Sequence, residues 1–188
     1  MGFGQLEGSV TFPTLETKRL LLRLPVQEDF DAGWADFHQD EECMRFIGGP
    51  MPRSLAWRAL AQVVGMWSLR GFGQFSAIDK ETGKWVGRVG LWEPEDWPAP
   101  EIGWMLHRRA WGKGYAAEAA EACLSYAFVN LGWSSVAHMI HPDNKASQSV
   151  AKRLGSYWIK DIRLPPPLDG GVTQMWGQTA AEWKSRAN

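Results

Sequence analysis

Two glycines separated by one lysine stand at the start of the strongest helical segment of the chain, in the stretch 109-RAWGKGYAAEA-119. A strand-like apolar run (101–106) precedes them, and an alanine-rich run follows and ends near Gly132. Glycine is the least favourable ordinary residue inside a helix, so two of them at a helix entry need a conformational or functional reason. The order of strand, basic loop, glycines and helix is therefore the unit around which the remaining elements must be arranged.

The other apolar patterns predict a mixed succession of strands and helices. Strand-like runs cover 17–24, 72–78, 85–92, 101–106, 135–140, 156–164 and 173–178. Helical spacing covers 27–39, 54–70, 111–131 and 145–154, with Ser54 and either Asp143 or Asn144 as N-caps. Because helices and strands do not alternate one for one, we expect an α+β (mixed α/β) domain around a central, largely antiparallel sheet.

Composition limits the possible classes of function. The 188 residues are 45% hydrophobic and 22% charged, which fits one domain spanning 1–188 with a full core. The net charge of −1 provides no global positive field for a nucleic acid. Cys43 and Cys123 show no zinc-ligand spacing, so we expect no metal site and a reducing, cytoplasmic location. Residues 1–10 lack a signal-peptide pattern, and no apolar run approaches the roughly 20 residues of a membrane span.

The glycine pair has two interpretations. Backbone N–H groups at a helix start lack partners and the helix dipole is positive there, so glycines that admit an anion would make a phosphate cradle. Arg109 and Lys113 add local positive charge. The alternative is a helix-entry turn that binds nothing. GxxxxGK[ST] is absent, as is GxGxxG after a first strand, which argues against a P-loop kinase and a Rossmann dinucleotide binder.

Longer segments resemble the GNAT acetyltransferase superfamily. The pattern 109-RxxGxGxA-116 is similar to its acyl-CoA pyrophosphate motif, (Q/R)xxGx(G/A). Four further segments resemble, in the expected order, the subgroup of the ribosomal-protein alanine acetyltransferases RimJ and RimL: 16–29, 101–119, 142–155 and 176–183. The resemblance thus spans nearly the whole chain.

The resemblance implies a GNAT fold and acetyl-CoA as the cosubstrate. The sheet would be seven-stranded, mostly antiparallel, splayed between its fourth and fifth strands (101–106 and 135–140) and flanked by about four helices. The loop would hold the pyrophosphate, and the fourth strand would offer free backbone groups to the pantetheine arm. The residues expected to bind acetyl-CoA are Trp104, Met105, Leu106, Arg109, Trp111, Gly112, Lys113, Gly114, Tyr115, Ala116, Asn144, Ser147 and Lys152.

Acetyl transfer from a thioester requires a neutral amine, a stabilised oxyanion and a protonated leaving thiol. Glu101 begins the strand that leads to the acetyl site and is the candidate base, directly or through water; the alternative is a solvated strand end. Many family members place a tyrosine acid seven residues after the asparagine of this helix, where Ala151 stands here, and Tyr157 lies beyond the helix. The resemblance leaves Ser147 and, less well, Ser149 as the general acid or as a hydrogen-bond partner of the thiol.

Three histidines and four tryptophans also have expected positions. His107 lies in the phosphate loop and is expected at the surface, while His138 and His141 are expected to be structural. Four tryptophans are candidates for an aromatic wall of the acceptor pocket, with core packing as the alternative for each: Trp67, Trp92, Trp97 and Trp104.

These residues together support an acetyl-CoA-dependent N-acetyltransferase that acts on a primary amine by direct attack on the thioester. The resemblance favours a protein N-terminal α-amine as the acceptor, and a small-molecule amine (an antibiotic or amino acid derivative) is the alternative. A CoA-binding module without catalysis is the second class, which Ala151 favours. We expect no nucleic-acid or membrane partner, and a monomer or homodimer.

Overall fold

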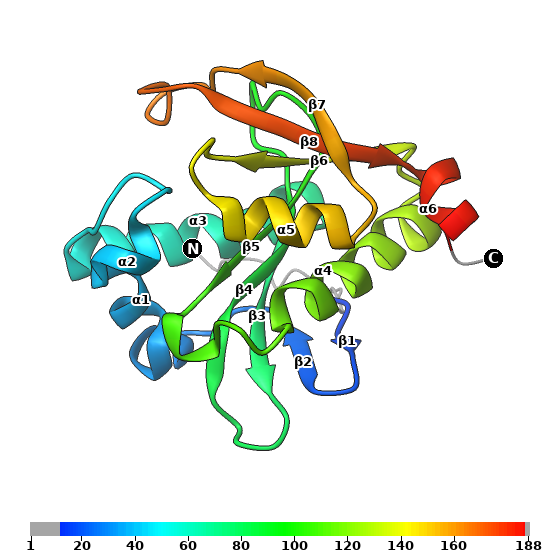
Figure 1. Ribbon diagram of the computed structural model, residues 1–188. Helices are drawn as coiled ribbons and strands as arrows, with labels where there is room; N and C mark the ends of the chain where they lie inside the picture. The colour runs from blue at the N-terminus through cyan, green and yellow to red at the C-terminus, as the bar shows by residue number, and fades with distance from the viewer. Residues whose placement is uncertain (1–11, 187–188) are drawn as a thin grey trace, which may run out of the picture.

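The computed structural model describes residues 12–186 and builds them around an eight-stranded sheet (Figure 1). The strand order is β1-β2-β3-β4-β5-β6-β8-β7, and all neighbours are antiparallel except β5 and β6. The strands are β1 (Leu15–Glu16), β2 (Leu20–Arg23), β3 (Gln74–Asp79), β4 (Trp85–Trp92), β5 (Glu101–Leu106), β6 (Ser135–Ile140), β7 (Tyr157–Ile162) and β8 (Thr173–Thr179). Residues 1–10, for which we predict no signal peptide, lie outside the described residues.

The prediction of seven strands is wrong by one, and the additional strand is β1. The run 17–24 is not one strand, because the chain turns at Thr17, whose N–H donates to the carbonyl of Leu20 at 2.9 Å. β1 therefore folds back on β2 as a short antiparallel neighbour. The other six predicted strands are present, and β4, β5 and β6 have the predicted ends.

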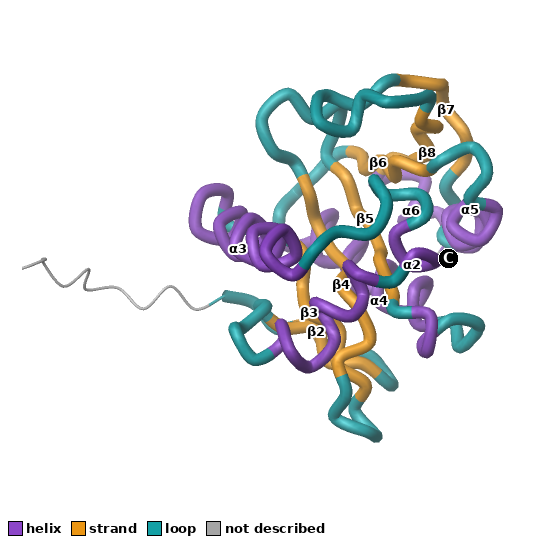
Figure 2. Tube along the Cα trace, turned by 90° about the vertical axis from the view of Figure 1, so that its left-hand side faces the viewer, coloured by secondary structure: helices purple, strands orange, loops and turns teal. Residues whose placement is uncertain are grey.

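Helices cover both faces of the sheet, with α3 on one side and α5 and α6 on the other (Figure 2). In the described chain they are η1 (Phe30–Trp34), α1 (Ala35–Gln39), α2 (Glu41–Met44), α3 (Arg53–Arg70), η2 (Arg108–Ala110), α4 (Tyr115–Ser125), η3 (Tyr126–Asn130), α5 (Lys145–Arg153) and α6 (Ala180–Arg186). The four predicted helices correspond to η1–α1, α3, α4–η3 and α5. The sequence predicts neither α2 nor α6, which have only four and seven residues. No helix in the described part is long and apolar enough to cross a membrane.

The helix after the glycine loop begins at Tyr115, not at Trp111 as predicted. Gly112 and Gly114 have φ angles of 73° and 79°, a left-handed conformation that a right-handed helix cannot include. The two glycines therefore form the turn that precedes α4.

The two predicted N-caps have different outcomes. α3 begins at Arg53 after Pro52, and no side chain caps it, so Ser54 is not its N-cap. α5 is capped by Asn144, whose side-chain oxygen accepts a hydrogen bond from the N–H of Ser147 at 3.0 Å.

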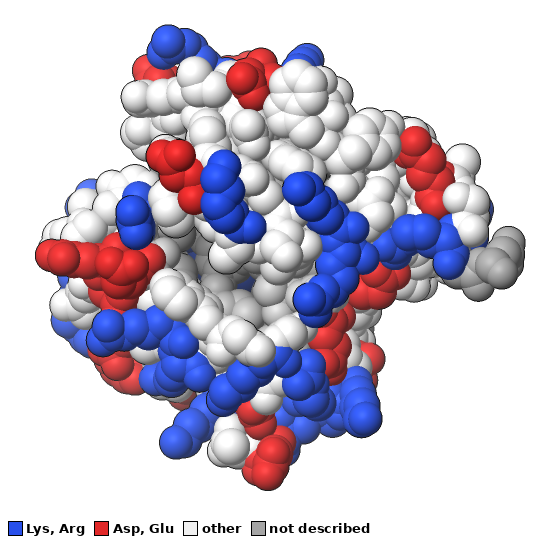
Figure 3. All heavy atoms as spheres, in the orientation of Figure 1, with Lys and Arg blue, Asp and Glu red and all other residues white. Residues whose placement is uncertain are grey.

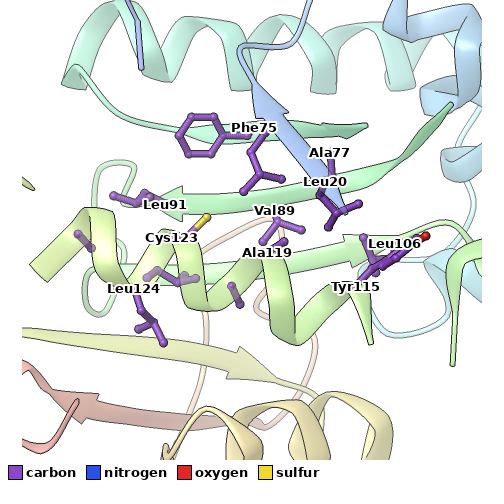
Figure 4. Packing of buried hydrophobic residues seen from close by; sticks show 14 of the residues in the cluster. Leu20, Phe75, Ala77, Val89, Leu91, Leu106, Tyr115, Ala119, Cys123 and Leu124 are labelled. Atoms are coloured by element: carbon purple, nitrogen blue, oxygen red, sulfur yellow. The ribbon is translucent and has the colours of Figure 1, made fainter. Parts of the chain in front are cut away.

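The middle strands are buried on both faces. Figure 4 shows Ala119 and Cys123 of α4 packed toward Val89 and Leu91 of β4, in a cluster whose members are almost fully buried. A second cluster covers the opposite face, where Trp34, Phe37, Val63 and Trp85 are at most 1% exposed. Because both faces are packed, β4 and β5 are rigid and fix the position of the residues that they carry.

Candidate active site

The sheet opens between β5 and β6. The two strands share a single parallel bridge, Glu101 with Ala137, and the N–H of Ala137 also donates to the carbonyl of Pro100 at 2.8 Å. Beyond this bridge β5 pairs only with β4, and β6 only with β8. The predicted separation of these strands is confirmed, and it leaves the edge of β5 beyond Glu101 without a strand partner.

His138 spans the opening. Its Nδ1 lies 2.7 Å from the carbonyl oxygen of Ile102, and its Nε2 lies 2.9 Å from Oγ of Ser156. A carbonyl only accepts, so Nδ1 carries the proton and Nε2 accepts from the serine hydroxyl. Burial lowers the pKa of His138 to about 4. The ring is therefore a neutral part of the fold with both nitrogens hydrogen-bonded.

Alternate residues of β5 face the opening. Consecutive residues of a strand direct their N–H and C=O groups to opposite edges. The carbonyl of Ile102 points to β6, so the backbone groups of Trp104 and Leu106 do so as well. The carbonyl of Leu106 already accepts the indole N–H of Trp111 at 2.7 Å. Met105 is paired with Arg88 of β4, which makes its backbone unavailable, contrary to the expectation of free groups along all three residues. Its side chain instead lines the neighbouring cleft.

Six consecutive backbone N–H groups are free at the start of α4. Among residues 12–186, none accepts a hydrogen bond from the N–H groups of 112–117, and Glu118 is the first to bond back, to the carbonyl of Gly114 at 3.2 Å. The N–H groups of 109–111 have acceptors inside the loop. Free amides at a helix N-terminus, beside residues with positive φ, form an anion site. Four free N–H groups (114–117) are usual at the start of a helix without a side-chain cap, and those of Gly112 and Lys113 extend the run to six.

The side chain of Arg109, predicted as a local positive charge, is bonded to backbone carbonyls of other elements. Its Nη2 donates to the carbonyl of Trp85 at 2.8 Å and to that of Ala32 at 3.3 Å. Gly33 makes this approach possible, because a Cβ there would lie 2.6 Å from the same nitrogen. Arg109 therefore links the loop to β4 and η1 by hydrogen bonds. Lys113 remains exposed.

Arg19 supplies a cation that the sequence does not suggest. It pairs with Glu118 at 2.6 Å and donates from Nη1 to the carbonyl of Lys113 at 2.9 Å. Its guanidinium lies 4.6 Å from the ring centroid of Tyr115, whose hydroxyl is bonded to Asp79 at 2.6 Å. Figure 3 shows Lys and Arg side chains around a hollow on this face of the molecule.

α5 approaches the opening through Ser147. Oγ of Ser147 accepts a hydrogen bond from the indole N–H of Trp104 at 3.2 Å, so its own hydroxyl proton can be donated elsewhere. Asn144 orients the serine by capping the helix. Lys152, farther along α5, is exposed and lies 5.7 Å from the ring of Trp176.

No tyrosine lines the cleft beside this opening. Ala151, which stands at the position of the family's tyrosine, is fully buried with Ile140 and Trp176. Tyr157 is half-exposed on the edge strand β7 and bonded to Glu182 at 3.2 Å. Tyr157 therefore does not replace the missing acid.

Glu101 is buried, so the alternative of a solvated strand end is wrong. Its side chain accepts the N–H of Met139 at 3.2 Å and the indole N–H of Trp97 at 2.7 Å. Loss of solvent raises its pKa to about 7, against the opposing effects of these two hydrogen bonds and of the Arg88 charge. A pKa near the working pH is the property that general acid–base catalysis favours.

A cavity of about 820 Å³ adjoins the opening. It lies between the α2–α3 loop and the β7–β8 loop, and Glu101 lies in its wall. Trp92, Trp97 and Trp104 also line it, as predicted for an aromatic wall. Trp67 does not, because it is buried in the core against Phe75, with ring centroids 4.8 Å apart.

Similarity to known proteins identifies the family. The acetyltransferase (GNAT) domain family matches residues 19–156. The chain belongs to this GNAT family. It is 43% identical over 156 residues (79% of this chain, 88% of the relative) to the uncharacterized protein YkkB of Bacillus subtilis strain 168. It is 33% identical over 145 residues (75% and 80%) to the uncharacterized N-acetyltransferase p20 of Bacillus licheniformis. A crystal structure of an acetyltransferase from Agrobacterium tumefaciens strain C58 has a TM-score of 0.79 and 29% identity, covering 93% of this chain and 99% of that one.

Membership of the GNAT family makes the protein an N-acetyltransferase, and enzymes of this family use acetyl-CoA and an amine acceptor. Arg19 could not be found from local sequence patterns, because its partners lie 94 and 99 residues away. Arg88 was not predicted either, although a charge in the middle of the apolar run 85-WVGRVGLW-92 is a readable signal. In the described chain no three His, Cys, Asp or Glu residues are placed to hold a metal ion.

Proposed function

We propose that the chain, as one domain over 1–188, transfers the acetyl group of acetyl-CoA directly to a primary amine. The observation that carries this proposal is the run of six free N–H groups at 112–117 beside the open edge of β5. The amides fit a pyrophosphate, and the free edge of β5 fits the amides of a pantetheine arm. The backbone groups of both sites therefore match the hydrogen-bonding groups of acetyl-CoA.

The proposed acetyl-CoA contacts follow the backbone geometry. The pyrophosphate binds the N–H groups from Gly112 to Ala117, which include those of Lys113, Gly114, Tyr115 and Ala116. The pantetheine arm pairs with Trp104 and Leu106, and Asn144 and Ser147 contact it from α5. Lys113, Arg19 and Lys152 add positive charge nearby, while Arg109, Trp111 and Met105 position the loop and the strand.

Glu101 is the proposed general base. It takes a proton from the acceptor's ammonium group, directly or through water, and the neutral amine attacks the thioester carbon. The C–S bond then breaks, and the leaving sulfur takes a proton from the hydroxyl of Ser147 or from water. That oxygen regains a proton from the nitrogen, which loses its second proton as the amide forms. A buried carboxylate with a pKa of about 7 is well matched to an α-amine, whose pKa is about 7.7–8.0.

A protein N-terminal α-amine remains the preferred acceptor, in line with the RimJ/RimL-like sequence features, and a small-molecule amine is the alternative. We place the enzyme in the cytoplasm, as a monomer or homodimer. Thiol release from acetyl-CoA with pooled peptides and pooled small amines tests the activity and separates the two acceptor classes. Binding of CoA without turnover of any amine would instead identify a CoA-binding module.

A further inference from the structure

Arg88 is a half-buried cation in the wall of the acceptor cleft. It stands in the middle of β4 between the buried residues Gly87 and Val89, and it lines the cavity. Its Nη1 donates to Oε1 of Gln74, and its guanidinium carbon lies 5.2 Å from the ring centroid of Trp34. Its Nε is buried without an acceptor among residues 12–186, and no carboxylate in that range forms an ion pair with it.

A cation that is largely removed from water and has no paired anion is unfavourable. Burial lowers the pKa of Arg88 to about 10, so the guanidinium still carries its charge at neutral pH. Glu101 raises the pKa of Arg88 through its charge but forms no direct ion pair with it, and its two oxygens accept from Met139 and Trp97. The cleft therefore contains a positive charge that the described residues leave without a direct counter-ion.

His38 does not add to this charge. Its ring is 1% exposed, and its Nδ1 lies 2.8 Å from the carbonyl oxygen of Trp34, so Nδ1 carries the proton. Burial and the neighbouring Arg88 lower the pKa of His38 to about 4. Its Nε2 is thus an unprotonated acceptor, and it has no partner among the described residues of this cavity. A buried acceptor atom and a half-buried cation without counter-ion, both in one cleft, point to a polar ligand.

We propose that Arg88 binds a carboxylate of the acceptor, so that the preferred substrate carries a carboxylate close to its reactive amine. This inference rests on the proposed function, with the amine placed at Glu101. Gln74 lies between the two charged groups. Its Nε2 and the Oε1 of Glu101 lie 3.5 and 3.4 Å from the point where a Cβ of Gly103 would stand. Because Gly103 has no side chain, there is room beside the Gln74 amide for a short acceptor that contacts both Glu101 and Arg88.

Two pairs of matched probes test the inference and distinguish the sources of such a carboxylate. The peptide pair is Ala-Glu-Ala-amide and Ala-Gln-Ala-amide, and the small-molecule pair is 5-aminopentanoate and 5-aminopentanamide. We expect the carboxylate member of one pair to exceed its amide partner at least tenfold, both in kcat/KM and in affinity measured by calorimetry with CoA present. The pair that shows the preference identifies the source.

Variants of the full chain assign the preference to Arg88. Arg88→Met should reduce it to less than twofold, Arg88→Lys should keep part of it, and acetyl-CoA affinity should stay unchanged in both. Arg45→Met is the matched control, because Arg45 lines the same cavity but is exposed. Any effect of Arg88 on the ionisation of Glu101 changes both members of a pair equally, so their ratio reports the carboxylate contact alone. Thermal melting verifies that each variant is folded.

The two proposals fail in different ways. Equal binding of carboxylate and amide probes by the wild-type protein, or a preference that survives in Arg88→Met, overturns the role of Arg88, even if amines are acetylated. Carboxylate-dependent binding that is lost in Arg88→Met, without any acetylation, supports the Arg88 site and refutes the transferase function proposed above.

Discussion

Replacing Glu101 with glutamine should change stability and activity in opposite directions. The folded protein holds the Glu101 proton with a pKa of about 7, against an ordinary 4.5, because burial disfavours the carboxylate. Folding therefore takes up a proton between these values, and stability falls as the pH rises from 4.5 to about 7. At 1.36 kcal/mol for each tenfold change in proton affinity, the loss is about 3 kcal/mol. Glutamine cannot ionise, so Glu101→Gln should lack this loss.

The assay is denaturant unfolding at pH 5 and at pH 8. The difference in unfolding free energy between the two pH values should be smaller in Glu101→Gln than in the wild type, by about 3 kcal/mol at most. The glutamine amide cannot make one of the hydrogen bonds with Trp97 or Met139. This destabilisation is the same at both pH values, so it cancels in the difference. Glu81→Gln, at an exposed turn position, is the control and should leave the difference unchanged.

Activity provides the second half of this prediction. The kcat/KM of Glu101→Gln should fall by about 10²–10⁴, the usual contribution of a general base. In the wild type, kcat/KM should rise with pH through the ionisation of Glu101 near 7, and this step should be missing in the variant. An unchanged pH difference in stability would refute the burial argument. A variant with wild-type kcat/KM would refute the catalytic role.

Three further substitutions test the cradle and α5. Gly114→Ala and Gly83→Ala each force alanine into a left-handed conformation, at about 1–2 kcal/mol of stability, but only Gly114→Ala should raise the KM for acetyl-CoA, at least tenfold in steady-state assays. Asn144→Ala should lose a helix cap, about 0.5–2 kcal/mol by chemical denaturation, whereas Asp143→Ala should not. Ser147→Ala should lower kcat about a hundredfold if its hydroxyl protonates the thiol, and an unchanged kcat would assign that step to water.

Local patterns predict the elements of this fold better than they predict its side-chain partners. The apolar runs of β4, β5 and β6 have the predicted ends because strand periodicity depends on neighbouring residues. The same reasoning places α4 too early, because the φ angles of Gly112 and Gly114 are not encoded in periodicity. Arg109 has a suggestive position in the motif, yet its guanidinium bonds to carbonyls of β4 and η1. Such contacts depend on tertiary approach, which no local pattern contains.

The chemistry proposed for Glu101 is a direct consequence of how the sheet opens. Glu101 forms the only bridge between β5 and β6 in the described chain, and beyond it the N–H of Met139 has no strand partner on β5. The Glu101 carboxylate accepts that N–H at 3.2 Å, which draws the side chain into the vertex of the opening. Burial at this vertex raises its pKa to about 7. The interruption of the ladder that leaves the backbone of Trp104 without a strand partner, where we propose that acetyl-CoA binds, thus also positions and tunes the proposed base beside it.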